Sequence, residues 1–295
     1  LAKLTADKYK TEHHEINISM NLKDDIEKIL LAYGKPFMDS SAIPSFYVSR
    51  EAKKYVTVIL NGDGADELFG GYRRYVPVAN DWFNIAQKIS PKTLKSFMDL
   101  FPVPNEKKSI YNYLYRLLSS SSKEPGLEKY LCLTTDIFGG FENYLSQSSL
   151  LNELNEQIAE VFMSSLTPLS QMLYLDFRIF LACDLLQKMD IAAMANSLEA
   201  RSPFLSKYII ELACTFPDRF KVRGITTKFI LRKLAKSYLP EKLISQPKRG
   251  FEVPLKKWLE HDLESMILDA LSIGCYSENF VEKKFLRKIV EKRIH

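Results

Sequence analysis

The residues best suited to chemistry form one short acidic loop at positions 61–67, NGDGADE. Three carboxylates fall within five residues of this loop: Asp63, Asp66 and Glu67. They would repel a bare phosphate, whereas Mg²⁺ binds one or two carboxylates together with phosphate oxygens. Gly62 and Gly64 permit positive φ and close approach of a ligand to the backbone. The loop is therefore predicted to hold Mg²⁺ against a polyphosphate.

A simpler interpretation of the same loop stays open. Acidic residues favour the first turn of a helix through capping and the helix dipole. Glycines are common in turns, and a short Gly-Asp pattern does not by itself distinguish a turn from a metal-phosphate loop.

The loop follows a run of β-branched and apolar residues, Tyr55–Leu60 (YVTVIL). Such a run without polar alternation is typical of a strand buried on both faces of a parallel sheet. In sheets of this kind ligands bind outside the carboxyl ends of the strands, and the acidic loop leaves such an end. We expect the strand to carry the loop into a binding site.

Other patterns predict the elements around this strand. An alternating strand is expected over His14–Ser19, a helix over Leu22–Tyr33 that Asn21 caps and Gly34 ends, and a second helix over Ser45–Tyr55. Strands joined through helices predict an α/β fold, a parallel sheet layered with helices.

Helical patterns dominate from about residue 81, with one extended piece expected over Asp218–Gly224. The predicted helices are Trp82–Asp99, Lys108–Ser119, Leu150–Ser164, Leu169–Leu198, Lys228–Leu239, Leu255–Leu271 and Glu282–Lys292. The predicted organisation is therefore an α/β nucleotide-binding part at 1–80 and a mainly helical part at 81–295.

Composition excludes several classes of function. The 295 residues are 46% hydrophobic and 26% charged, as in ordinary globular proteins. No apolar run reaches the roughly 18 residues of a membrane span, and the first residues do not resemble a signal peptide. The net charge of +5 comes without a continuous basic stripe, so nucleic acid is not an expected partner.

Cysteine and histidine usage argues against zinc and disulfides. The four cysteines are scattered singly, which is typical of a reducing compartment, and a cytoplasmic location is expected. The four histidines show no metal-ligand spacing.

Four blocks, in order, resemble the C-terminal synthetase domain of the glutamine-hydrolysing asparagine synthetase family, an adenine nucleotide alpha-hydrolase-like fold. The acidic loop with the following LFGGY matches the family pattern SG-(D/E)-G-x-DE-(L/V)-FGGY, and residues 36–44 precede it. The later blocks are Leu186–Asp190 with Met194–Leu205, Lys228–Arg232, and Lys248–Pro254 with Trp258. The resemblance spans Thr11 to Trp258.

The resemblance implies a chemistry and its substrates. ATP adenylates the side-chain carboxylate of aspartate and releases pyrophosphate, and ammonia derived from glutamine then displaces AMP to give asparagine. ATP and Mg²⁺ are the implied cofactors. Positioning and charge neutralisation dominate such a reaction.

Roles carry over by position. The nucleotide would contact Asn61, Gly62 and Gly64, and Asp63 would assist formation of the acyl-adenylate. Asp66 would ligate Mg²⁺, with Glu67 beside it. Lys228 would neutralise the α-phosphate and the departing pyrophosphate, supported by Arg232 one helical turn later. Asp39 and Arg201 are candidates for binding the substrate.

Plainer roles stay open for four of these residues. Lys228 and Arg232 also fit a solvated basic helix face, and Asp39 a turn or cap. Arg201 could bind a carboxylate or pair with Glu199 or Asp190.

The sequence departs from the family pattern at several points. A pyrophosphate-binding SGG-x-DS loop is expected upstream of His13, and neither Gly70–Gly71 nor Gly139–Gly140 has that setting. A glutaminase domain is likewise missing, so the chain is expected to be truncated at both ends and to show negligible ATP–pyrophosphate exchange alone. Asn61 replaces the usual Ser, Ile191 an Arg, and Ser206 an Asp.

These departures leave other functions open. One is amidation of a different carboxylate, such as a sugar acid in surface polysaccharide synthesis. Another is a non-catalytic relative that keeps the fold as a nucleotide- or partner-binding module. The oligomeric state is a separate question, and a homodimer is one alternative.

Overall fold

The computed structural model describes residues 1–35, 37, 39–82, 91–98, 100–101, 109–124, 126–134, 150–246, 253–254, 257–271, 274–279 and 281–291. The chain forms two compact units, each built from two segments. The first unit combines Leu1–Val76 with Leu173–Trp258, and the second combines Pro77–Met172 with Leu259–His295. The division predicted from the sequence, between an α/β part at 1–80 and a mainly helical part at 81–295, stays a prediction.

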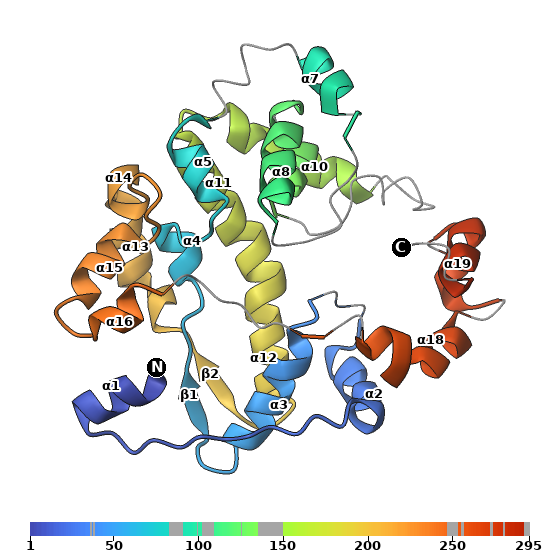
Figure 1. The fold of residues 1–295 in the computed structure, drawn as a ribbon, viewed down its shortest axis with the longest axis horizontal. Helices are drawn as coiled ribbons and strands as arrows, with labels where there is room; N and C mark the ends of the chain where they lie inside the picture. Colours follow the sequence, from blue (N-terminus) through green and yellow to red (C-terminus); the bar gives the residue numbers. More distant parts are fainter. Residues whose placement is uncertain are drawn as a thin grey trace. The chain divides into compact units, whose positions relative to one another are not determined.

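A two-stranded parallel sheet lies in the first unit, where β1 (Val58–Leu60) runs beside β2 (Glu199–Arg201) (Figure 1). The register pairs Val58 with Glu199 and Leu60 with Arg201. The ladder continues beyond β1, because the backbone N–H of Asn61 donates to the carbonyl of Arg201 at 2.9 Å. The first residue of the acidic loop is therefore fixed to the sheet.

The expected burial of the strand was wrong. The strand covers three residues rather than the whole run from Tyr55, and Leu60 is 73% exposed. Among the described residues β2 is the one strand that pairs with β1, and two strands provide too few neighbours to bury this run on both faces. The α/β class is thus seen as a small parallel sheet among many helices, and the expected layering of sheet and helices stays a prediction.

The strand expected over His14–Ser19 was also wrong, because these residues form no regular element. Alternation predicts a strand only where another strand is available to pair with it. Here the contacts are between neighbouring side chains: His13 Nε2 lies 3.5 Å from Glu15 Oε1, and His14 Nε2 lies 3.1 Å from Glu12 Oε1. One apolar residue of the segment, Ile18, packs against the core.

Helices make up most of the first unit. They are α1 (Ala2–Tyr9), α2 (Leu22–Tyr33), α3 (Ala42–Ala52), α4 (Ala65–Phe69), α12 (Leu186–Met194), α13 (Lys207–Thr215), α14 (Asp218–Lys221), α15 (Phe229–Ala235) and α16 (Glu241–Ile244), with a π-helical segment η2 (Asp176–Leu185) and a 3₁₀ turn η3 (Pro203–Leu205). Helix α5 (Tyr75–Ala79) begins at the end of the first segment of this unit.

The predicted bounds of the first helix were confirmed, since α2 spans Leu22–Tyr33 and ends at Gly34 with φ 65°. Asn21 holds the N-cap position, but its amide binds the Asp24 carboxylate at 2.6 Å instead of capping a backbone N–H. The next helix begins three residues earlier than expected, at Ala42. Its third residue is Pro44, and proline is tolerated in the first turn because the N–H it lacks has no helical partner there.

Two apolar clusters hold the elements near the loop. Ile29 and Tyr33 of α2 and Phe46 of α3 pack with Ala192 of α12, so α12 is fixed from one side. Leu68 and Phe69 of α4 pack with Ala213 of α13, and Phe204, Leu205 and Phe216 join this cluster. Because α4 begins within the acidic loop, at Ala65, its burial anchors the loop.

The helix expected over Leu169–Leu198 is a succession of three helical segments: α11 (Pro168–Leu175), η2 and α12. A 3.6-residue pattern cannot signal the wider i→i+5 bonding of the middle segment. The extended piece expected over Asp218–Gly224 was mostly wrong, because Asp218–Lys221 is helical after Pro217. Extended pairing is confined to a bridge between Arg223 and Thr226.

The regular elements of the second unit, in its described residues, are helices. It contains α7 (Pro91–Met98), α8 (Ile110–Ser121), α9 (Leu127–Thr134), α10 (Leu150–Met163), α18 (Glu264–Ala270), α19 (Lys283–Val290), a π-helical turn η4 (Trp258–Asp262) at the segment boundary and a 3₁₀ turn η5 (Tyr276–Asn279). Three predicted features lie wholly or partly outside the described residues. They are residues 83–90 of the helix expected over Trp82–Asp99, the pair Gly139–Gly140, and residues 248–252 of the last sequence block. No helix in the described part of the chain is long and apolar enough to cross a membrane.

Candidate functional site

Asn61 ties the acidic loop to the end of β2. Its Nδ2 donates to Asp63 Oδ2 at 2.8 Å, and the backbone N–H of Asp63 donates to Asn61 Oδ1 at 3.3 Å. The hydroxyl of Ser202, the residue after β2, donates to the same Oδ1 at 2.5 Å. Asn61 therefore joins the loop to both strands and holds the Asp63 carboxylate. Ser202 had no predicted role, because only the strand register brings it next to Asn61.

Two glycines of the loop serve different purposes. Gly64 has φ 87°, and a Cβ there would lie 2.8 Å from Leu205 Cγ, so this residue must be glycine for α4 to start against η3. A Cβ at Gly62 would meet nothing within 4 Å. The backbone at Gly62 is therefore open on this side, and its contact with a nucleotide stays a prediction.

Asp66 and Lys228 form an ion pair at the start of α4 and α15. Lys228 Nζ lies 3.0 Å from Asp66 Oδ1, and the two side chains are 28% and 17% exposed. Lys228 has φ 50° and ψ 39°, a left-handed conformation that is uncommon for a residue other than glycine and that tends to occur at functional sites. Its backbone N–H donates to the carbonyl of Gly70 at 3.2 Å. The structure thus brings together two predicted site residues that are far apart in the sequence.

Gly71 lies against this ion pair. A Cβ on Gly71 would overlap Asp66 Oδ1 and Lys228 Cε and would lie 2.6 Å from Asp66 Cγ. Its N–H donates to the carbonyl of Asp66 at 2.8 Å. The absence of a side chain at Gly71 therefore makes room for the pair, a role that the LFGGY pattern alone did not reveal.

The side chain of Glu67 is buried and paired with Tyr72. It is 1% exposed and accepts a hydrogen bond from the Tyr72 hydroxyl. Burial, together with the charge of Glu67, raises the pKa of Tyr72, so this phenol stays protonated and remains a donor. The predicted metal role of Glu67 stays a prediction, and its carboxylate is oriented toward Tyr72 in the interior.

The donors of the loop limit how a metal ion could bind. In the described part of the chain no three His, Cys, Asp or Glu side chains are grouped as metal ligands. A cation held by protein groups alone does not fit. Mg²⁺ that takes most of its ligands from phosphate and water fits, because it needs only one or two carboxylates and Asp66 is partly exposed.

Arg232 binds backbone carbonyls, and its predicted support of the nucleotide phosphates stays a prediction. Its Nε donates to the carbonyl of Thr227 at 2.9 Å, and Nη1 donates to the carbonyl of Ile244. Both terminal nitrogens also lie 3.4 Å from the carbonyl of Gln246. The guanidinium therefore binds the backbone that precedes α15 and follows α16, and it holds α15 in position.

The two candidate substrate residues are paired with other side chains. Arg201 Nε donates to Glu199 Oε1 at 2.7 Å, and both side chains are more than half exposed. Asp39 Oδ2 lies 2.8 Å from Lys188 Nζ, which also donates to Ser41 Oγ at 2.8 Å. For each residue the structure shows the plainer alternative, a local pair for Arg201 and a turn for Asp39.

The charge of Asp39 also affects a second carboxylate, that of Asp184. Burial acts to raise the pKa of Asp39, but the hydrogen bonds and charge of Lys188 and the Ser41 contacts outweigh it and lower that pKa. At Asp184 the charge of Lys188 also lowers the pKa, but by less than its surroundings raise it. Burial, and then the charge of Asp39, raise the pKa of Asp184 to about 6.

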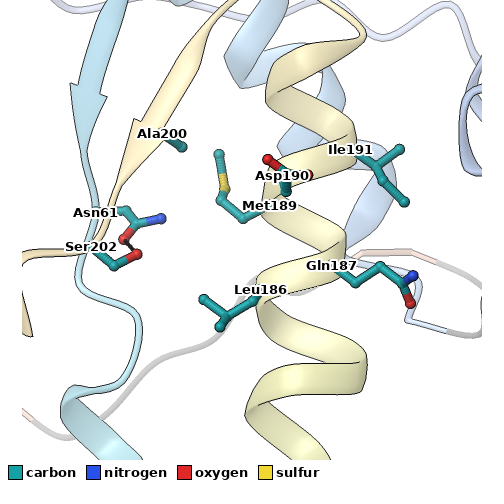
Figure 2. Close-up of a pocket in the computed structure, with 8 residues that line it drawn as sticks. All are labelled: Asn61, Leu186, Gln187, Met189, Asp190, Ile191, Ala200 and Ser202. Carbon is teal, nitrogen blue, oxygen red and sulfur yellow. Dashed lines mark hydrogen bonds between the residues drawn. The ribbon is translucent and has the colours of Figure 1, made fainter. Parts of the chain in front are cut away.

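An open cleft of about 460 Å³ lies between the ends of the strands and α12 (Figure 2). The strand side contributes Asn61, Ala200 and Ser202, and α12 contributes Leu186, Gln187, Met189, Asp190 and Ile191. Figure 2 shows Leu186 and Met189 directed from α12 toward the strands. Asn61 is the predicted site residue that lines this cleft, which therefore joins the start of the acidic loop to a mixed apolar and polar surface.

Comparison with known proteins identifies the class to which this fold and loop belong. A family model described as asparagine synthase matches residues 1–295, and the chain belongs to that family. The resemblance predicted from the sequence blocks is confirmed.

Individual relatives match most of this chain but less than half of their own length. Asparagine synthetase [glutamine-hydrolyzing] 1 of Bacillus subtilis (strain 168) is 30% identical over 280 residues, which is 91% of this chain and 42% of the relative. A putative asparagine synthetase of Mycobacterium tuberculosis (strain ATCC 25618 / H37Rv) is 30% identical over 79% of this chain and 35% of its own length. Amidase chyE of Penicillium rubens is 22% identical over 80% of this chain.

Proposed function

We propose that this domain binds ATP with Mg²⁺ and activates a carboxylate as its acyl-adenylate, which a nitrogen nucleophile then converts to an amide. In the first step a carboxylate oxygen attacks the α-phosphorus and pyrophosphate leaves. In the second, ammonia attacks the acyl carbon, loses a proton, and AMP departs. The observation that carries the proposal is the Asp66–Lys228 ion pair, whose carboxylate belongs to a loop that follows a parallel strand and has an open backbone at Gly62.

The ion pair explains how one loop accommodates both a cation and an anion. Without ligand, Asp66 and Lys228 neutralise each other at 3.0 Å. When the nucleotide binds, the Lys228 ammonium can exchange Asp66 for phosphate oxygens, and Asp66 is then available to the cation. Bound Mg²⁺ would neutralise charge on the phosphates. Lys228 would stabilise the negative charge that develops as pyrophosphate leaves, the kind of preorganised electrostatic effect that lowers barriers most.

Other residues of the loop would orient the nucleotide. Gly62 leaves its backbone accessible, so a phosphate or ribose oxygen can approach closely. Asn61 holds Asp63 through its amide, and this contact orients the carboxylate, which would assist formation of the adenylate. Arg232 contributes indirectly, because it positions the helix that begins after Lys228.

Aspartate is the acceptor we propose first, with asparagine, AMP and pyrophosphate as products. Relatives matching most of this chain bear the name of glutamine-hydrolysing asparagine synthetase. We infer that ammonia comes from glutamine hydrolysed by a part of the complete protein outside this chain, which spans less than half of those relatives. A second acceptor class has its own support, because one relative is named an amidase and Ile191 in the cleft replaces the Arg of the family pattern.

The decisive experiment measures carboxylate-dependent exchange of pyrophosphate into ATP by the complete protein. Aspartate and a panel of uronic acids would be compared, with product analysis by mass spectrometry. Exchange that depends on aspartate supports asparagine synthesis. Exchange that depends on another acid keeps the adenylation and replaces the acceptor. Binding of Mg²⁺–ATP without exchange with any acid would establish the non-catalytic alternative.

A further inference from the structure

A buried polar network connects η2 to the segment that follows α4. Asp176, the first residue of η2, has no exposed surface. Its Oδ2 accepts from Arg74 Nε at 3.1 Å and Nη2 at 2.9 Å, and from the Tyr75 hydroxyl at 2.5 Å. Burial acts to lower the pKa of Arg74, but the charge and hydrogen bonds of Asp176, together with Tyr75 and Tyr72, outweigh it, so Arg74 stays charged. One carboxylate oxygen thus anchors two consecutive side chains.

The network continues from Arg74 to α4. The Arg74 guanidinium lies over the ring of Tyr72, with its carbon 4.0 Å from the ring centroid, and over Phe180 of η2 at 5.2 Å. The hydroxyl of Tyr72 donates to Glu67, the neighbour of Asp66 in α4. Residues 72–75 are therefore held at one end by η2 and at the other by a buried residue of α4.

Both members of the Asp66–Lys228 pair are attached to the backbone just before this segment. The Gly71 N–H donates to the carbonyl of Asp66, and the Gly70 carbonyl accepts from the N–H of Lys228. A shift of residues 70–75 would move the two attachment points together with the surface of Gly71 on which the side chains rest. The position of the pair thus depends on the position of this segment.

Stability alone does not account for such a network. A buried ion pair has a large desolvation cost, and well-packed apolar residues often replace it without loss of stability. Its fixed directions can instead define one arrangement of the backbone. The carboxylate also lies on a π-helical segment, a structure that is rare and frequently found at functional sites.

We propose that Asp176 is a positioning residue, which through Arg74, Tyr75 and Tyr72 holds residues 70–75 so that Lys228 stays against Asp66. Its chemical purpose rests on the proposed function, since the pair is the group expected to act on the nucleotide. The positioning itself does not require ATP, so it can be tested even if the proposed reaction is wrong.

The test measures how fast an amine-reactive acylating reagent labels individual lysines, by mass spectrometry, in folded protein. Lys228 is partly protected by its pair with Asp66, and Lys188 by its pair with Asp39, which gives an internal reference in the same unit. Asp176→Asn keeps the shape of the side chain but removes its charge. Labelling of Lys228 is expected to rise about threefold or more, a change within the range of measured couplings between contacting residues, while Lys188 is unchanged.

Asp25→Asn is the matched control, because Asp25 is another poorly exposed aspartate of this unit and accepts from Arg50 at 2.9 Å. It should leave Lys228 labelling as in the parent protein. Equal increases in the two variants would attribute the effect to general loosening and overturn the proposal. So would an unchanged rate at Lys228 in Asp176→Asn.

A milder variant covers the case in which Asp176→Asn does not fold. Tyr72→Phe removes one hydroxyl from the middle of the network and leaves the buried ion pair intact. It should also raise labelling of Lys228 relative to Lys188, and no change there would count against the proposal. If the parent protein shows no pyrophosphate exchange, the proposed reaction is refuted. The labelling result does not depend on that reaction and would still stand.

Discussion

Lys228 Nζ lies 3.0 Å from Asp66 Oδ1, and both side chains rest against the bare Cα of Gly71. In the proposed function the two side chains neutralise each other in the free protein, and each takes a new partner when Mg²⁺ and a polyphosphate bind. The charges that the proposed reaction needs would thus be present before the ligand.

The first prediction concerns the carboxylate of this pair. Asp66→Ala in the complete protein is expected to lower Mg²⁺-dependent pyrophosphate exchange about 100-fold or more, because it removes a preorganised charge from the site. Thermal unfolding should change little, since Asp66 is partly exposed. Glu211→Ala, on the exposed face of α13, is the comparison variant and should retain exchange. Normal turnover in Asp66→Ala would show that the residue does not serve the metal–nucleotide complex.

The second prediction concerns Gly71. Gly71→Ala places a methyl group 2.6 Å from Asp66 Cγ, so the ion pair must separate. We expect a loss of about 1–3 kcal/mol in the free energy of unfolding, as for other insertions into packed sites, and a large loss of exchange. Gly62→Ala, where a methyl group meets nothing within 4 Å, should change the free energy of unfolding by less than about 0.5 kcal/mol. Urea unfolding followed by circular dichroism compares the two, and equal losses would contradict the geometry.

A third prediction separates the two roles considered for Arg232. Because its guanidinium binds the carbonyls of Thr227, Ile244 and Gln246, Arg232→Met should cost about 1–3 kcal/mol in unfolding free energy by leaving acceptors unsatisfied. Arg232→Lys should rescue little, because one ammonium cannot reproduce the planar set of donors. If instead the stability is unchanged while the KM for ATP rises severalfold, Arg232 contacts the phosphates as the family pattern implied.

The pH dependence of stability provides a fourth prediction. The raised pKa of Asp184, about 6, means that the folded protein binds its proton more tightly than the unfolded chain does. Asp184 therefore lowers the stability progressively as pH rises from about 4 to about 6, and the loss is then constant. Asp184→Asn has no such titration, so its stability relative to the parent should increase over that window by about 1 kcal/mol after allowance for solvent screening. Chemical unfolding at pH 4, 5, 6 and 7 measures the difference, and a difference independent of pH would contradict the assignment.

Local patterns were sufficient for several elements. The helix at Leu22–Tyr33 was predicted residue for residue, because its apolar spacing and Gly34 are both local signals. The strand–loop–helix order around the acidic loop was also readable from the sequence. Burial was not readable in the same way. A run such as YVTVIL indicates that its side chains favour burial. The actual exposure of Leu60 depends on how many neighbouring strands are present.

The amino-acid sequence by itself determined the family, the position of the acidic loop after a strand, and the residue types that a Mg²⁺–polyphosphate site requires. Tertiary structure decided which of these residues meet. It paired Lys228 with Asp66, turned Glu67 toward Tyr72, and engaged Arg232 with backbone carbonyls. The physical reason is that contacts between α4, α15 and η2 join residues far apart in the chain, and spacing along a sequence reports only the contacts within one helix or strand.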